Sequence, residues 1–185
     1  MKHIGTQAIE TERLTLRRFQ PSDAQAMFDN WAAQNEVTKF LMFDAHTDIG
    51  DSRYVVNMWV GNYESEDTYR WAICLKGGDP IGAILVNVEW EDDFKAELSY
   101  AIGSSYWGNG YTSEAARAVV DYMFKGTDIE RIESYCATAN PASGGVLRKA
   151  GLRHEGFARH KYLSRIGFQD CDLYGIVRDE WEERQ

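Results

Sequence analysis

The sequence predicts a mixed α/β domain of about seven strands, in the order β-α-α-β-β-β-α-β-α-β-β. Two kinds of apolar spacing support this prediction, a period of two in the strand segments and an i, i+3, i+4 pattern in the helix segments. The 185 residues contain no internal repeat, low-complexity segment or flexible linker, and 44% of them are hydrophobic. We therefore expect one domain spanning residues 1–185, large enough to bury a sizeable core.

The N-terminal third is predicted to hold one strand and two helices. Apolar and polar residues alternate in Glu12–Phe19, as in a strand with one buried face. A helix follows Pro21, where Ser22 with Gln25 resembles a capping box. Its apolar residues have the spacing of one helix face: Ala24, Met27, Phe28 and Trp31. A second helix is predicted to begin at Thr47.

Strands dominate the middle of the chain. Tyr69–Leu75 and Ile81–Trp90 flank Lys76–Pro80, whose sequence KGGDP is typical of a turn, so we expect a hairpin. Ala96–Ile102 is the next strand and follows the acidic turn Glu91–Lys95.

The C-terminal half is predicted to contain two helices and three strands. Ser113–Lys125 carries an apolar stripe formed by Ala116, Val119, Val120 and Met123. A short helix follows Asn140, which suits the N-cap, and Pro141, which suits the first helical position; Gly151 suits the residue after its end. The strands are Arg131–Thr138, the segment near Phe157–Ser164 and the segment near Asp170–Arg178.

Charge and composition exclude several classes of protein. The net charge of −9 argues against broad nucleic-acid binding and suits a cationic substrate such as an amine. No apolar run is long enough to span a membrane, and the first residues lack the apolar core of a signal peptide, so we expect a cytoplasmic protein. The four histidines lack metal-ligand spacing, and we expect no metal. The cysteines are expected to be buried small hydrophobes: Cys74, Cys136 and Cys171.

The most informative segment is Ser105–Ala116, in which Gly108 and Gly110 form a short turn between a predicted strand and a predicted helix. Glycine lets a ligand approach the main chain, and the first N–H groups of a helix bind anions. The turn therefore suits a phosphate-bearing ligand, although tight loops without any ligand also contain glycines.

Five segments, in this order, resemble the GNAT superfamily of acyl-CoA-dependent N-acetyltransferases, and most closely its ribosomal-protein N-terminal acetyltransferase branch: ETERLTLRRFQPSDA, AELSYAI, YWGNGYTSEAARAVVDYMF, NPASGGVLRKAGLRHEG and Asp170 with Arg178–Trp181. The resemblance covers nearly the whole chain. It implies a splayed, mostly antiparallel sheet of about seven strands flanked by about four helices. It also implies acetyl-CoA as co-substrate and a primary amine as acceptor.

The resemblance implies that the pyrophosphate of acetyl-CoA binds the family's phosphate signature. The corresponding residues here are Trp107, Gly108, Asn109, Gly110, Tyr111 and Thr112. Trp107 replaces the usual Gln or Arg, and Thr112 replaces the usual Gly or Ala. Main-chain groups near Ala101 and Ile102 would pair with the pantetheine arm. Asn140 would contact the same arm, or it serves only as an N-cap. Likewise, Thr112 or Ser113 would serve only as the cap of the preceding helix if no ligand binds there.

Two residues are candidates for catalysis. Glu97 would deprotonate the amine through water, or it is a structural carboxylate paired with a nearby cation. Ser143 corresponds to a serine near the thioester sulfur in this branch, where it would donate a hydrogen bond to the departing thiolate. Leu147 stands where many members have a tyrosine acid. His160 and Lys161 lie where some relatives have a Glu, and His160 or bulk water is the next candidate base after Glu97.

Three functions are compared at this point. The leading one is an N-acetyltransferase in which the amine attacks the thioester directly in a ternary complex, because no cysteine lies in a matching motif. The others are a nucleotide-binding module and a catalytically silent acyl-CoA sensor. The acceptor, a protein N-terminus such as that of a ribosomal protein or a small amine, stays open, as does the choice between monomer and homodimer. The acceptor site is expected around Trp31–Asp48.

Overall fold

The computed structural model describes residues 1–90 and 93–184, so Glu91 and Asp92 of the predicted acidic turn lie outside the described residues. Eight strands are found within them: β1 (Ile9–Glu10), β2 (Leu14–Arg17), β3 (Tyr69–Leu75), β4 (Pro80–Trp90), β5 (Lys95–Ile102), β6 (Arg131–Ala137), β7 (Arg153–Ser164) and β8 (Gly167–Val177). The α-helices are α1 (Ala24–Met27), α2 (Asn35–Thr38), α3 (Ile49–Asn62), α4 (Tyr111–Gly126), α5 (Pro141–Ala150) and α6 (Arg178–Glu182).

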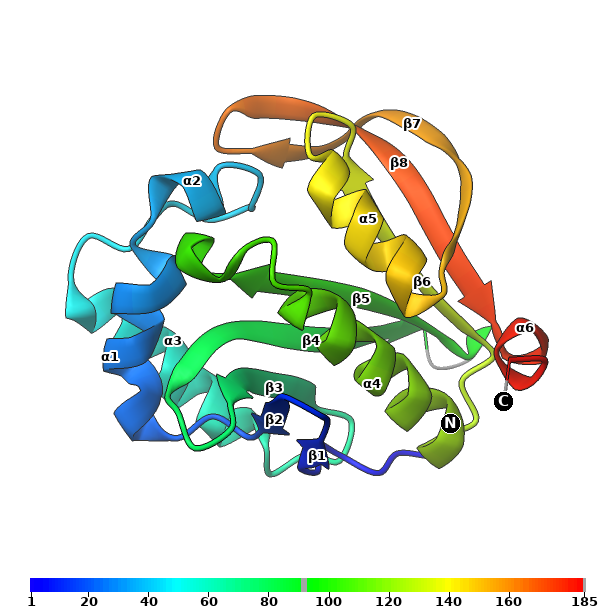
Figure 1. Cartoon of the computed structure of the whole chain (residues 1–185), viewed down its shortest axis with the longest axis horizontal. Coiled ribbons are helices and arrows are strands. Elements are labelled where there is room, and N and C mark those ends of the chain that lie inside the picture. Colours follow the sequence, from blue (N-terminus) through cyan, green and yellow to red (C-terminus); the bar gives the residue numbers. More distant parts are fainter. Residues whose placement is uncertain (91–92, 185) are drawn as a thin grey trace.

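The strands form one sheet in the order β1-β2-β3-β4-β5-β6-β8-β7 (Figure 1). Every neighbouring pair is antiparallel except β5 and β6, which are parallel. These two strands pair only at Lys95, Ala96 and Glu97, whereas β5 continues along β4 as far as Ile102. The sheet therefore splits in its middle, as the predicted splayed sheet requires.

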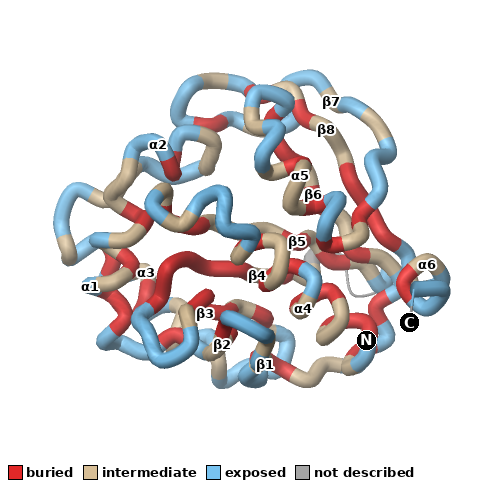
Figure 2. Tube along the Cα trace, in the orientation of Figure 1, coloured by how far each residue is buried: buried red, intermediate tan, exposed pale blue. Residues whose placement is uncertain are grey.

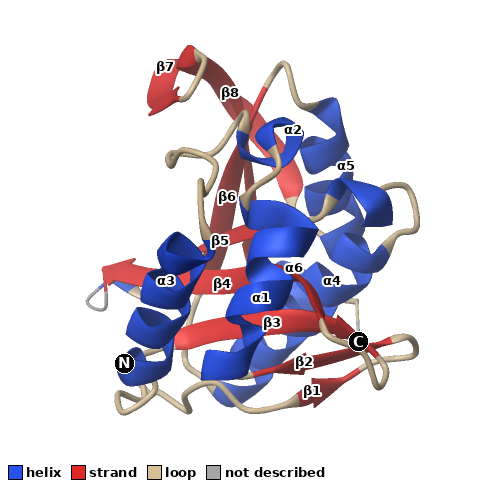
Figure 3. Cartoon of the chain, turned by 90° about the vertical axis from the view of Figure 1, so that its left-hand side faces the viewer, coloured by secondary structure: helices blue, strands red, loops and turns tan. Residues whose placement is uncertain are grey.

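Helices cover both faces of the sheet. Figure 3 shows α3 on one side of the strands and α4 and α5 on the other. The predicted apolar stripe of α4 lies in the core, where Val119 and Met123 are fully buried. On the other face, Phe19, Trp31 and Val56 pack against small side chains of β3 and β4. The buried residues thus follow the central strands and the inner helix faces (Figure 2).

The structure corrects several local predictions. The helix after Pro21 is a 3-10 turn, the short α1 and a π-helical turn at Phe28–Ala32, and not one regular helix. The predicted capping box at Ser22 is also wrong, because the N–H of Gln20 instead donates to the carboxylate of Asp23 (2.8 Å). Three short elements were not predicted, namely β1, α2 and α6, and α6 begins at the residue where the last strand was expected to end.

Candidate active site

The split between β5 and β6 is fixed by one buried side chain. Where the ladder ends, the hydroxyl of Ser134 in β6 donates to the main-chain carbonyl of Leu98 in β5 (2.8 Å). This bond gives the Leu98 carbonyl a partner just beyond the last ladder pair, Glu97 with Glu133. Beyond Leu98 the two strands diverge, and the main chain of β5 borders an open space.

The register decides which main-chain groups of β5 border the gap. The N–H of Gly103 donates to β4 (3.0 Å), so by antiparallel alternation the polar groups of Ile102 and Tyr100 face away from β4. Those of Ala101 face β4 and belong to its ladder. The main chain of Ala101 is therefore not available to pair with a ligand in the gap. The main-chain groups of Tyr100 and Ile102 are the ones that face it. The carbonyl of Ile102 already accepts a hydrogen bond from the indole of Trp107 (3.0 Å).

The glycine turn leads directly into α4. Gly108 and Gly110 have positive φ angles of 77° and 81°, which L side chains rarely adopt. Gly110 is the N-cap, and no side chain caps this helix. The alternative that Thr112 or Ser113 serves only as a cap is thus contradicted, and the first N–H groups of α4 are left for an anion.

Two residues of the glycine turn, Asn109 and Tyr111, contact Arg13. Arg13, which directly precedes β2, donates to the main-chain carbonyl of Asn109 (3.0 Å), and its guanidinium lies 4.7 Å from the ring centre of Tyr111. The same arginine pairs with Glu114 of α4 (2.7 Å). Asn109 and Tyr111 do not line the cavity described next.

A cavity of about 810 Å³ passes through the gap. The cofactor side is formed by the glycine turn and by α4 and α5, and it includes Trp107, Gly108, Gly110, Thr112, Ser113, Asn140, Ser143, Gly145 and Lys149. The acceptor side is formed by the segment around α2 and by strand residues, and it includes Glu36, Phe40, Met42, Asn87, Glu97, Tyr135 and Tyr162. Ala101 and Ile102 border both. One cavity therefore joins most of the predicted residues.

Helix α5 meets the cavity with its first turns. Asn140 is the N-cap residue of α5, as predicted, but its side chain makes no cap hydrogen bond, and its contact with the cofactor arm stays a prediction. A Cβ at Gly144 would lie 2.6 Å from the hydroxyl of Tyr174, whereas a Cβ at Gly145 would meet nothing within 4 Å. The two glycines thus differ in purpose, since Gly144 allows close packing on the sheet and Gly145 leaves space in the cavity. Lys149, which the sequence did not single out, adds a positive charge on this side.

Ser143 has a partner that the sequence analysis missed. The hydroxyl of Tyr100 lies 2.9 Å from the Oγ of Ser143 and donates to the main-chain carbonyl of the same serine at 2.9 Å. Burial raises the pKa of Tyr100 well above its usual value, so this phenol is neutral. Leu147 is fully buried and does not line the cavity.

Glu97 points to the face of the sheet opposite to that of Tyr100. Its register partners are Asn87 of β4 and Glu133 of β6, and its side chain is partly buried. It shares a strand face with Ser99 and Ala101, and Ala101 packs with the cluster under α1 and α3. His160 is exposed, stacks on Phe168 at a centroid distance of 5.3 Å and does not line the cavity. The cavity therefore favours Glu97 over His160 as the base.

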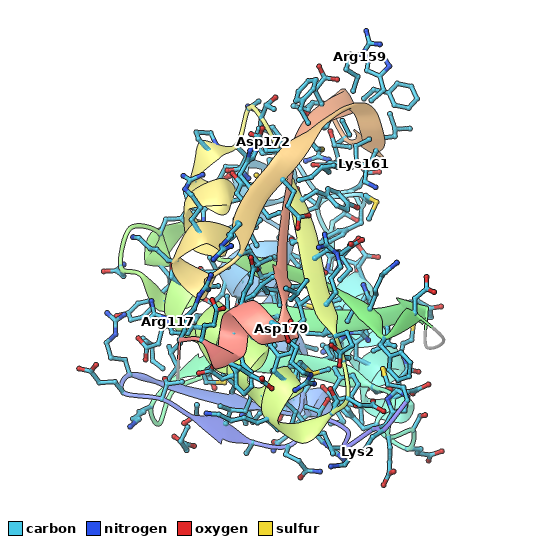
Figure 4. The ribbon with its side chains drawn as sticks, turned by 90° about the vertical axis from the view of Figure 1, so that its right-hand side faces the viewer. Lys2, Arg117, Arg159, Lys161, Asp172 and Asp179 are labelled. Atoms are coloured by element: carbon cyan, nitrogen blue, oxygen red, sulfur yellow. The ribbon has the colours of Figure 1, made fainter. Side chains whose placement is uncertain are left out.

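The segment around α2, on the acceptor side, is tied to the β7–β8 hairpin by two side chains. The hydroxyl of Tyr162 in β7 donates to the carbonyl of Phe40 (2.7 Å), and Arg165 beyond β7 pairs with Asp44 (3.0 Å). Lys161 lies over the ring of Tyr135 (5.1 Å), and Figure 4 shows it near the tip of the β7–β8 hairpin, remote from α6. Part of the segment Trp31–Asp48 lines the cavity, namely Glu36, Val37 and residues 39–42, and its role in acceptor binding stays a prediction.

Comparison with known proteins identifies the fold family. Residues 13–153 match the family model described as an acetyltransferase (GNAT) domain. The chain belongs to the GNAT family. It is 28% identical over 176 residues to the uncharacterized N-acetyltransferase p20 of Bacillus licheniformis, covering 95% of this chain and 98% of that protein. It is 25% identical over 174 residues to the putative ribosomal N-acetyltransferase YdaF of Bacillus subtilis, covering 92% and 94%.

A solved GNAT structure extends the comparison to the whole fold. The ribosomal L7/L12 α-N-protein acetyltransferase RimL, in complex with coenzyme A, matches with a TM-score of 0.83 at 20% identity, covering 94% of this chain and 99% of that chain. Family membership decides among the three functions, since this GNAT protein is an acetyl-CoA-dependent N-acetyltransferase. Nothing in the comparisons supports the silent sensor.

The GNAT site fits acetyl-CoA by its own residues. An uncapped helix N-terminus follows Gly110, and the open space at Gly145 and the charge of Lys149 lie on the same side of the cavity. One cysteine, Cys136, also lines the cavity, but burial raises its pKa to about 11. A thiol that stays protonated is a poor nucleophile, which favours direct attack by the amine.

Two searches of the described residues concern other kinds of site. In residues 1–90 and 93–184, no three His, Cys, Asp or Glu side chains gather closely enough to hold a metal ion. Among the helices of the same residues, none is long and apolar enough to cross a bilayer.

Proposed function

We propose that the protein transfers the acetyl group of acetyl-CoA to a primary amine inside the gap between β5 and β6. The observation that carries this proposal is the single cavity, which Glu97 and Ser143 line from opposite faces of the sheet. We expect the acetyl group to bind between them, with the acceptor amine on the Glu97 side and the leaving sulfur on the Ser143 side. Both residues thus have a role at the same reacting centre.

The proposed reaction needs three contributions from the chain. Glu97 accepts a proton from the acceptor ammonium through water, because only the neutral amine is a nucleophile. The N–H of Ile102, which faces the gap, donates to the developing oxyanion. Ser143 donates a hydrogen bond to the thiolate as the carbon–sulfur bond breaks. The N–H groups of α4 and the side chain of Asn140 hold the pyrophosphate and pantetheine arm.

The acceptor that we favour is the α-amine of a protein N-terminus, such as that of a ribosomal protein. YdaF is described as a putative ribosomal N-acetyltransferase, and RimL as a ribosomal L7/L12 α-N-protein acetyltransferase. A peptide amine enters past the apolar side chains of Phe40 and Met42.

A small amine is the second candidate. The contacts between the β7–β8 hairpin and the segment around α2 favour it. Tyr162 and Arg165 attach the β7–β8 hairpin to the segment around α2, which narrows the entrance for a long chain. The two candidates differ in the acceptor's length and leave the chemistry at Glu97 unchanged.

An acetylation screen tests both candidates. Purified protein is incubated with acetyl-CoA and a panel of N-terminal peptides and small amines, and release of free thiol is measured alongside the product mass. Acetylated peptides with an intact lysine side chain would support the protein N-terminus. Turnover confined to small amines would replace the first candidate by the second, and the absence of turnover with every amine would refute the proposed reaction.

A further inference from the structure

Tyr100 and Ser143 form a pair in the wall of the cavity, and the pair rests on two contacts. The phenol oxygen of Tyr100 lies 2.9 Å from the carbonyl oxygen of Ser143 and 2.9 Å from its Oγ. The two residues come from β5 and α5, on the cofactor side of the sheet, and both line the cavity. The pair thus links β5, which borders the gap, to helix α5, which covers the cofactor side of the cavity.

The number of protons in this pair limits its orientation. A carbonyl oxygen accepts only, so Tyr100 must donate its single proton to the carbonyl of Ser143. The remaining contact then has Ser143 as the donor and the phenol oxygen as the acceptor. In this resting arrangement the hydroxyl proton of Ser143 is directed at Tyr100, and the serine presents its lone pairs to the cavity.

Ser143 cannot hydrogen-bond a thiolate in that state, because its proton is engaged elsewhere. To donate to sulfur, the serine hydroxyl must rotate into the cavity, which removes its bond to Tyr100. The phenol proton can then move from the carbonyl of Ser143 to its Oγ, since both acceptors lie at 2.9 Å. A hydroxyl that accepts one hydrogen bond is a better donor in the next.

We infer that Tyr100 is a positioning residue for the acetyl transfer. In the resting state it accepts the hydrogen bond of the Ser143 hydroxyl. When that hydroxyl rotates toward the leaving sulfur, Tyr100 donates a hydrogen bond to the Oγ of Ser143. This inference rests on the proposed role of Ser143. No net proton leaves Tyr100 in the step. Covalent bonds to hydrogen stay as they are, and only the hydrogen-bond directions change. The raised pKa of the phenol agrees with a group that does not ionise during turnover.

Three variants test the inference: Tyr100→Phe, Ser143→Ala and the double variant. Tyr100→Phe keeps the ring and removes one hydroxyl, so we expect kcat to fall about fivefold, the size of one weakened hydrogen bond. The KM for acetyl-CoA and the melting temperature should stay near the parent values. Because Tyr100 acts through Ser143, adding Tyr100→Phe to Ser143→Ala should change kcat by less than about twofold.

A matched control shows whether the fall in kcat requires loss of the Tyr100 hydroxyl or follows from loss of any tyrosine hydroxyl. Tyr122 donates to the carbonyl of Gly5 (2.6 Å) and does not line the cavity, so Tyr122→Phe should leave kcat unchanged. Multiplying effects in the double variant would overturn the inference, as would an unchanged kcat in Tyr100→Phe while Ser143→Ala is slow. An unchanged kcat in Ser143→Ala itself would refute the proposed role of Ser143, and the inference with it.

Discussion

The adjacent glycines of α5 allow a prediction in which stability and binding change in opposite directions. The perturbation is Gly145→Ala. A Cβ at this position would meet no atom within 4 Å, and the residue lines the cavity. The substitution should therefore stabilise the helix while it takes space from acetyl-CoA.

The magnitudes follow from the position of Gly145 inside the helix. Exchanging Gly for Ala in a helix interior stabilises a protein by about 1 kcal/mol. For a chain of this size, that corresponds to a melting temperature about 2–4 °C higher. Overpacking a site costs about 1–3 kcal/mol, so we expect the Kd for acetyl-CoA to rise at least about fivefold.

Gly144→Ala is the matched control, because it makes the same chemical change one residue earlier. Its Cβ would lie 2.6 Å from the hydroxyl of Tyr174, which also accepts a hydrogen bond from Arg148 (2.9 Å). The helix gain is then offset by a clash of about 1–3 kcal/mol, so this variant should melt at the parent temperature or below it.

Both variants are measured by thermal unfolding without acetyl-CoA and by calorimetric titration with it. The reasoning about Gly145 would be refuted by a lower melting temperature in Gly145→Ala, or by an unchanged Kd. A higher melting temperature in Gly144→Ala would refute the assignment of Gly144 to packing.

Three other substitutions test the roles proposed for single residues. Glu97→Gln should lower kcat by about 10²–10⁴-fold with little change in acetyl-CoA affinity, and a loss of tenfold or less in steady-state assays would indicate a structural carboxylate. Ser143→Ala should slow turnover about tenfold, whereas Leu147→Ala should lower the free energy of unfolding by about 2–5 kcal/mol through a cavity, as denaturant titration would measure. Gly110→Val should abolish tight coenzyme A binding in a folded protein, because valine rarely adopts a φ of 81° and its side chain would border the anion site; equal affinity in a titration would contradict the assignment.

The sequence predicted the long elements well, because their patterns repeat over several turns or strand positions. The helix at Ser113–Lys125 and the strands at Tyr69–Leu75 and Arg131–Thr138 lie within two residues of the observed bounds. The short elements β1, α2 and α6 were not predicted, because two to five residues are too few to show a periodic pattern. The π-helical turn at Phe28–Ala32 escaped for another reason, since its apolar spacing also fits an ordinary helix.

For the site, local motifs predicted the glycine turn and the start of α5. The contact between Tyr100 and Ser143 could not be predicted, because it joins residues 43 positions apart. Alternation places Tyr100 on the same strand face as Leu98, which is a core residue, so its hydroxyl gave no signal of its own. Lys149 escaped similarly, since a lysine near a helix end is common on solvated surfaces.

The split sheet should make the stability of the folded state rise when the co-substrate binds. Only three residue pairs join β5 to β6, and beyond Leu98 the two halves of the sheet have no ladder between them. A ligand that binds the gap attaches one half to the other, and binding only to the folded chain adds about 2.7 kcal/mol at a concentration of 100 times Kd. The melting temperature of this protein should therefore rise with the concentration of acetyl-CoA. The protein should be least stable when acetyl-CoA is scarce.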